Sequence, residues 1–221
     1  MKLLDELRSE HGLIEQVAGS LETFARLRAS GAAGPEDGAA FLLFFRVFSG
    51  GYHHAREEET LFRALSEQAE LKPTSGPLAS MVGQHHAMAA TLEEAAPLLT
   101  ADAAALAASG RGPALVTLAE TYARALWQHI DAENSVLLPE SAERLMRAGV
   151  RELEGRGPTE AEAAARSEGE RLVRLYPPAD DRGAIRGEGC VVCASYGTTC
   201  NGVEAEWWND SEWEEFSDHL G

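Results

Sequence analysis

Cysteine is scarce in this chain of 221 residues, which contains only three, all near its C-terminal end. An odd number of thiols cannot be paired completely within one chain, so a disulfide framework is excluded as the basis of the fold. This usage fits a reducing compartment, and we expect a cytoplasmic protein.

The sequence also lacks a long apolar run and an excess of basic residues. No stretch approaches the roughly 18 consecutive apolar residues of a membrane-spanning helix, and Asp5 and Glu6 stand where a secretory signal would need apolar residues. The 19 lysines and arginines are outnumbered by 36 aspartates and glutamates, for a formal net charge of -17. So acidic a surface repels nucleic acid and anionic membranes, and we expect neither as a partner.

Helical periodicity dominates the first two thirds of the chain. Apolar residues recur every three or four positions, and turn sequences such as SGAAGPEDG, KPTSGP and SGRGP separate the runs. Four long helices are predicted. The first runs from about residue 3 to the late twenties, and the second over 41–68. The third lies between KPTSGP and SGRGP and carries Leu78, Met81, Met88 and Leu92. The fourth carries Leu115, Leu118, Tyr122, Leu126 and Leu137, and it is closed by Pro139 with a continuation to about 149. With 44% hydrophobic residues the chain can bury one sizeable core. The fold class is therefore all-α, with residues 1–149 forming an antiparallel up-down four-helix bundle.

The rest of the chain divides near Pro178. Residues 150–178 are predicted to be a linker and a short fifth helix from about Glu160 to Tyr176. Residues 179–221 lose helical periodicity and gather glycines, acids and three of the four tryptophans, which predicts an irregular tail. Its acidic and aromatic end, WWNDSEWEEF, could dock on a protein partner or fold back on the bundle.

The tail holds the three thiols, Cys190, Cys193 and Cys200. They could bind an additional metal, but a structural zinc or iron site takes four ligands, so His219, an acid or another chain would have to supply one. Alternatively, two of the thiols form a redox pair, or the cysteines are incidental in a flexible tail.

One short pattern occurs twice in the predicted bundle. In YHHAREEETLFRAL, from Tyr52, and in HIDAENSVLLP, from His129, a histidine is followed four residues later by a glutamate. This spacing puts both side chains on one helix face, one turn apart, so that both can reach one metal centre. The two pairs are His53 with Glu57 and His129 with Glu133.

Two more histidines, His11 and His85, occupy positions that the apolar faces of the first and third helices would give to a hydrophobic residue. A single histidine in such a place is more often a hydrogen-bonded core residue than a ligand. The set is different, because buried glutamates need compensating charge and each of the four helices offers at least one nitrogen. Together these residues indicate a pair of metal ions inside the bundle.

Over about residues 3–147 the chain resembles the hemerythrin family, whose bacterial members are often called HHE cation-binding domains. The segments that carry the resemblance are HHAREEETLF, GPLASMVGQHHAM and HIDAENSVLLP. The resemblance implies two non-haem irons, bridged by carboxylates and an oxo or hydroxo group. Carried over residue by residue, it implies six ligands: His11, His53, Glu57, His85, His129 and Glu133.

The register of the second helix allows another interpretation, with His54 and Glu58 as the ligand pair. Some apolar neighbours favour that face and others do not, but counting back nine residues from Phe62 and from Leu138 gives His53 and His129 at matching positions. We therefore expect His54 to lie outside the ligand set or at the surface. Glu58 and Glu59 are then expected on a solvated face, while Glu15 and His86 are expected to point away from the site.

The glycine pair Gly50–Gly51 lies just before this ligand turn, and each glycine costs about 1 kcal/mol inside a helix. The pair could permit a kink or bulge, or it could mark a break between two shorter helices.

The resemblance departs from the oxygen-carrying hemerythrins at two positions. Those proteins have a second histidine one turn after the first on the third helix and an aspartate on the fourth, where this chain has Ala89 and Glu133. One imidazole fewer leaves a coordination position open. The resemblance therefore implies a protein that binds or reacts with a small oxidant, such as oxygen, peroxide or nitric oxide, rather than an oxygen store. The alternative is a non-catalytic module for iron binding, iron sensing or repair of iron centres, and manganese or zinc would also suit such ligands.

Overall fold

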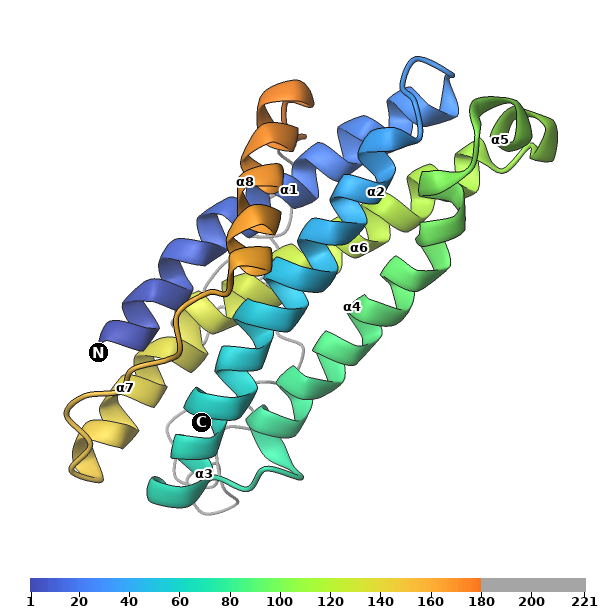
Figure 1. Cartoon of the computed structure of the whole chain (residues 1–221). Helices are drawn as coiled ribbons and strands as arrows, with labels where there is room; N and C mark the ends of the chain where they lie inside the picture. Colours follow the sequence, from blue (N-terminus) through green and yellow to red (C-terminus); the bar gives the residue numbers. More distant parts are fainter. Residues whose placement is uncertain (180–221) are drawn as a thin grey trace.

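The computed structural model describes residues 1–179, which are organised in helices with no strand among them. α1 (Lys2–Ala29) forms the first long rod (Figure 1). The second rod is continuous from α2 (Glu36–Leu43) through two π-helical stretches, η1 (Phe44–His54) and η2 (Glu57–Phe62), to α3 (Arg63–Gln68). Both the first and second rods follow the ranges predicted from the apolar periodicity.

α4 (Gly76–Thr100) and α6 (Gly112–Ala132) begin the third and fourth rods. The fourth rod continues through the π-helical η3 (Glu133–Leu137) into α7 (Leu138–Arg147). The four rods lie along the long axis of the molecule, and successive rods run in opposite directions (Figure 1). None of the described helices is both long and apolar enough to cross a membrane.

Local signals explain where these helices begin. Pro77 and Pro113 stand in the first turns of α4 and α6, where the missing N–H of proline costs nothing. A short helix that the sequence did not predict, α5 (Ala103–Ser109), lies between them. Its N-cap Asp102 accepts a hydrogen bond from the backbone N–H of Ala105 at 2.7 Å, and Gly110 ends it at φ 65°, a conformation that favours glycine.

The glycine pair lies inside η1, so of the two alternatives that the sequence left open, the second rod has a π-helical bulge and not a break. A π-helical turn closes i to i+5 hydrogen bonds and holds one residue more than an α-helical turn, which rotates the following side chains around the rod. η1 ends at His54, η2 begins at Glu57 and η3 begins at Glu133. All three π-helical stretches therefore adjoin the two histidine–glutamate turns.

The apolar core has two parts. The larger part surrounds Phe24, Phe41 and Leu126, and the smaller one surrounds Leu7 and Leu61. On the first three rods the predicted ligands fall between residues of the smaller cluster and residues of the larger one, and on the fourth rod Glu133 lies between Ile130 of the larger cluster and Leu137 of the smaller. A belt of polar groups thus crosses the interior between two apolar layers.

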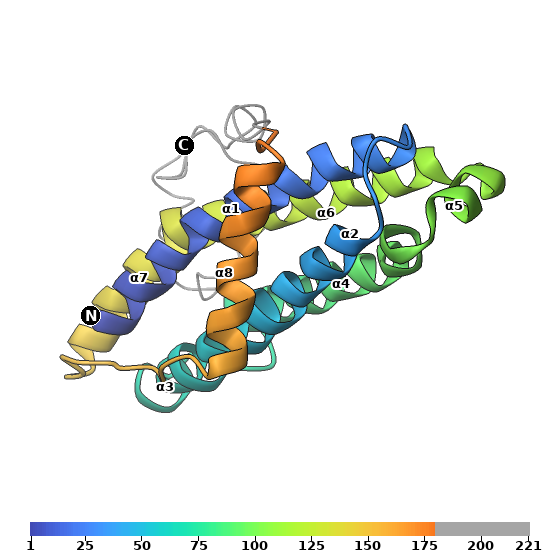
Figure 2. The same ribbon diagram turned by 45° about the horizontal axis from the view of Figure 1, so that its top comes forward.

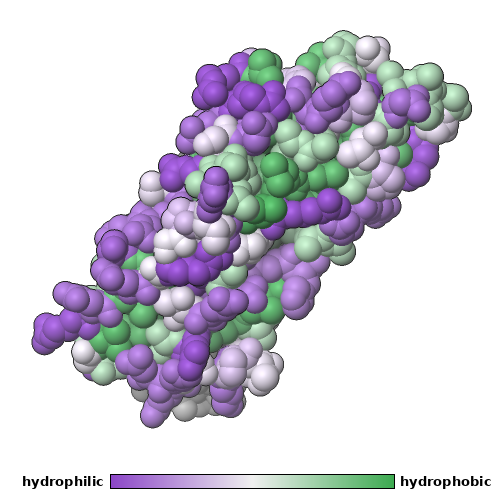
Figure 3. All heavy atoms as spheres, viewed as in Figure 1, coloured by the Kyte–Doolittle hydropathy of each residue, from purple (hydrophilic) through white to green (hydrophobic). Residues whose placement is uncertain are grey.

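α8 (Glu160–Leu175) lies where the fifth helix is predicted and crosses the α1 and η1 side of the rods (Figure 2). Its Ala165 and Leu172 are fully buried. At Gly169 a Cβ atom would lie 2.4 Å from the ring of Phe44, so only glycine permits this close approach. Polar residues cover much of the outer face, with apolar patches between them (Figure 3). The tail cysteines and the proposed partner segment lie outside the described residues.

Candidate metal centre

The polar belt brings together all six residues predicted as ligands and adds a seventh, His54. They come from four rods: His11 from α1, His53, His54 and Glu57 from the second rod, His85 from α4, and His129 and Glu133 from the fourth rod. All seven are buried, and the two glutamates are 0% exposed. The side chains form two groups that are each compact enough to hold a metal ion.

The first donor group consists of His11, His53, Glu57 and Glu133, and one ligand atom from each lies within 4.8 Å of the others. His11 Nε2 is 3.1 Å from Glu133 Oε2, and His53 Nε2 is 3.2 Å from Glu57 Oε1. This group offers two imidazole nitrogens and two carboxylate oxygens.

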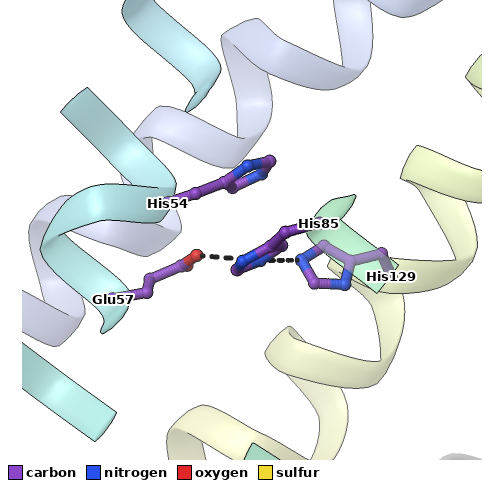
Figure 4. A group of neighbouring side chains, drawn as sticks. All are labelled: His54, Glu57, His85 and His129. Atoms are coloured by element: carbon purple, nitrogen blue, oxygen red, sulfur yellow. Dashed lines mark hydrogen bonds and ion pairs between the residues drawn. The ribbon is translucent and has the colours of Figure 1, made fainter. Parts of the chain in front are cut away.

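The second donor group consists of His54, Glu57, His85 and His129 (Figure 4). His85 Nε2 is 3.5 Å from Glu57 Oε2 and 3.0 Å from His129 Nε2. The ring of His54 stacks on that of His85 with centroids 3.9 Å apart. Glu133 also reaches this group, because its Oε1 is 3.3 Å from His129 Nε2.

Both carboxylates therefore lie between the two groups. Glu57 turns Oε1 toward His53 and Oε2 toward His85, and Glu133 turns Oε2 toward His11 and Oε1 toward His129. Within the described part of the chain, these four buried oxygens have no hydrogen-bond partner other than the histidine nitrogens that face them. Burying a carboxylate costs several kcal/mol unless positive charge compensates it. Two cations between the groups would supply that charge and use all four oxygens.

The outer nitrogens of the ligand rings are also ordered. Each of four histidines has its Nδ1 within hydrogen-bond distance of a side-chain oxygen from another rod. The pairs are His11 with Asn134 at 2.9 Å, His53 with Glu10 at 2.8 Å, His85 with Glu58 at 2.7 Å, and His129 with Gln84 at 2.9 Å. An Nδ1–H that donates to such an oxygen leaves the Nε2 lone pair directed inward, which is the usual arrangement behind a metal-bound histidine.

The electrostatics of the histidines differ between the two donor groups. Burial by itself would lower the pKa of His11, but contacts with Glu133 and Glu57 outweigh it and raise this pKa to about 10. Burial lowers the pKa of His129 to about 4 against the attraction of Glu133, and it lowers the pKa of His54 well below the usual value. At neutral pH a proton on His11 thus balances part of the carboxylate charge, while His129 and His54 keep a free lone pair.

The position of His54 corrects one expectation from the sequence. His54 is only 8% exposed and belongs to the second donor group, so a surface position is wrong. The choice of His53 over His54 as the ligand assumed a regular α-helix, in which neighbouring side chains point about 100° apart. At the end of the π-helical η1 both rings face the interior. The doubled His-His sequence and the Gly50–Gly51 pair were the signals of this arrangement.

Glu58 corrects a second expectation. Its side chain is 36% exposed, yet it contacts His85 instead of standing free on a solvated face. The sequence analysis also missed Glu10, Gln84 and Asn134. All four outer partners are next to a predicted ligand in the sequence, and each of the four rods carries one such neighbour that supports a histidine of another rod.

In a comparison with known families, the model of the hemerythrin HHE cation binding domain matches residues 2–141. These residues contain both donor groups and all four outer partners, whereas α8 and the segment leading to it lie beyond the match. Neither the curated proteins nor the solved structures include a match to this chain.

Proposed function

We propose that this chain, which belongs to the hemerythrin HHE cation-binding family, holds two non-haem irons. Its two adjoining donor groups support this proposal. We further propose that the pair binds or reacts with a small oxidant such as oxygen, peroxide or nitric oxide. The observation that carries the proposal is the orientation of Glu57 and Glu133. Each of these carboxylates directs one oxygen toward the first donor group and the other oxygen toward the second.

The residues fit this cofactor. Neutral imidazole and carboxylate are ligands that iron accepts, although manganese and zinc accept them too. The four carboxylate oxygens are buried acceptors that face only histidine nitrogens, so two cations would satisfy them, and the outer partners hold the ring nitrogens in the tautomer that binds metal. Bound iron would supply one-electron chemistry and a coordination position for a small molecule.

Counting donors suggests where that position lies. The second group can offer three imidazoles and two carboxylate oxygens, because His54 supplies an imidazole that the third helix lacks at Ala89. The first group offers only two imidazoles and two oxygens. An ion that takes six ligands therefore has more room for an exogenous molecule beside His11 and His53.

The chain itself keeps water out and fixes the ligands. The carboxylates are fully buried, and apolar layers close the belt on both sides. In such an environment the charges of Glu57 and Glu133 are poorly screened, which favours tight binding of cations. Four of the rings are held at Nδ1 by their outer partners and lose little freedom when a metal binds, so the site is organised in advance.

The test is an optical spectrum of the iron-loaded chain before and after one equivalent of peroxide, together with the iron-to-protein ratio. We expect two irons per chain and a spectral change on adding peroxide that is absent in a Glu133→Ala chain. A full iron content with an unchanged spectrum would instead favour the iron-binding or iron-sensing alternative. A ratio well below two would contradict the proposed pair.

A further inference from the structure

Arg56 is a buried charge next to the metal centre. Its side chain is 1% exposed, although guanidinium groups are almost never buried without partners. Nη1 donates to Glu10 Oε1 at 2.5 Å, and Nη2 donates to Glu6. The planar fork of arginine suits such simultaneous binding of two carboxylates. Arg56 therefore neutralises charge on α1 from its place between η1 and η2.

Glu10 links this arginine to the first donor group. Its second oxygen, Oε2, is 2.8 Å from His53 Nδ1, so one carboxylate bridges Arg56 and a proposed iron ligand. Glu10 is itself buried. With both oxygens engaged, the carboxylate has a single orientation, and the ring of His53 takes its orientation from it.

Arg56 is held in place by the segment between α7 and α8. A Cβ atom at Gly155 would lie 2.7 Å from Arg56 Nε and 2.8 Å from Leu3 Cδ1, so the backbone is packed directly against the guanidinium. The segment is anchored to α1, because the backbone N–H of Leu3 donates to the carbonyl of Leu153 at 3.0 Å.

The next residue, Arg156, joins this cover to η1. Its Nη2 donates to the carbonyl of Gly51 at 2.9 Å, and its guanidinium carbon lies 5.2 Å from the ring centre of Tyr52. The guanidinium carbon of Arg56 lies 4.5 Å from the same ring centre. Glu162 in the first turn of α8 holds Arg156 through two contacts of 2.6 and 2.7 Å.

We propose that Arg56 is a positioning residue for the first donor group, acting through Glu10 on His53, and that residues 153–156 keep it dry and in place. The inference rests on the proposed iron site and extends it to a segment beyond the family match, which ends at residue 141. Loss of an outer partner typically weakens metal binding 10–100-fold. Because Arg56 reaches His53 only through Glu10, its contribution should vanish when Glu10 is already changed.

A double-mutant cycle on the full chain tests this dependence. Arg56→Met and Glu10→Gln should each weaken binding of one iron by about 10- to 100-fold. The double variant should bind iron about as well as the weaker single variant. The matched control is Arg63→Met, which removes an exposed arginine of the same rod from its pair with Glu67 and should leave both irons in place. Losses that multiply in the double variant would overturn the proposal, as would wild-type binding in Arg56→Met.

The midpoint potential of the iron-loaded variants separates positioning from general damage to the fold. Glu10→Gln removes a negative charge behind His53 and should raise the potential, because the ferric state loses stabilisation. Arg56→Met removes a positive charge and should lower it. Shifts of the same sign in both variants would contradict a specific electrostatic path.

A pair of glycine variants covers the case in which Arg56→Met does not fold. Gly155→Ala should push on Arg56 and weaken binding of one iron, whereas Gly157→Ala, whose Cβ would meet nothing within 4 Å, should not. Equal affinities in the two glycine variants would overturn the role of the segment. If the wild-type chain binds no iron, the proposed function fails. The same cycle, read as the unfolding free energy of the metal-free chain, then tests the Arg56–Glu10 coupling, and additive losses would overturn it.

Discussion

The two donor groups share one plan but sit in different surroundings. Each has one histidine backed by a carboxylate and one backed by an amide: Glu10 and Asn134 in the first group, Glu58 and Gln84 in the second. Glu10 is buried with Arg56, whereas the side chain of Glu58 is 36% exposed. An exposed charge is screened by water and acts more weakly on its neighbour than a buried one. The comparison teaches that two similar sets of donor residues can lie in different electrostatic surroundings, so the two proposed irons should differ in character.

The largest effect should follow from changing a carboxylate that the groups share. Glu57→Gln keeps the size of the side chain but removes the charge that faces both groups. We expect the chain to lose both irons, measured as iron per chain after loading and desalting. Retention of one iron would show that Glu57 serves a single metal and would break the symmetry of the two groups.

Histidine variants should separate the groups. His53→Ala should empty the first group and His54→Ala should weaken the second, because the two neighbouring rings face different sets of ligands. Each variant should retain about one of the two irons, and His86→Ala, whose ring is exposed, should retain both. Full iron content in His54→Ala would return this residue to a supporting role, as the sequence register suggested.

The acid–base behaviour of the metal-free chain should also differ between the groups. The pKa of His11 is raised to about 10, so its contribution to stability is complete below pH 6.5 and is lost as the pH rises toward 10. The pKa of His129 is lowered to about 4, so the neutral ring is favoured and stability is lost as the pH falls from 6.5 toward 4.

Thermal unfolding of the metal-free chain from pH 4 to 10 should therefore show greatest stability near pH 6.5. Iron should flatten the profile, because it competes with protons at these nitrogens. A melting temperature that climbs steadily to pH 10 would contradict the role of His11.

The smallest effect should come from truncation after Pro178. All members of the two donor groups precede this point, and so do α8 and the Thr23 hydroxyl contact with the carbonyl of Pro177. The truncated chain should keep its helical content and both irons, as judged by circular dichroism and metal analysis. A loss of iron would assign the tail cysteines or His219 to the main site.

The sequence predicted the parts of this architecture that depend on periodicity. Apolar spacing and the Gly/Pro breaks gave the four rods, and the repeated His-x3-Glu turn gave His53, Glu57, His129 and Glu133 as a set. These signals are local, so each can be recognised within one helix.

The residues missed by the sequence analysis depend on contacts between rods. His54 faces the interior because η1 is π-helical, and α-helical periodicity does not describe such a turn. Glu10 supports His53 from another rod, 43 residues away, and Gly155 from the segment before α8 packs on the buried Arg56. No spacing within a single helix records such pairings.

The central claim, two irons joined by shared carboxylates, is tested most directly by Mössbauer spectroscopy of the full chain loaded with ⁵⁷Fe and oxidised. Two ferric ions that share Glu57 and Glu133 should couple magnetically, so we expect two irons per chain with a single coupled, diamagnetic ground state at low temperature. The paramagnetic spectrum of isolated ferric ions, or one iron per chain, would contradict the account.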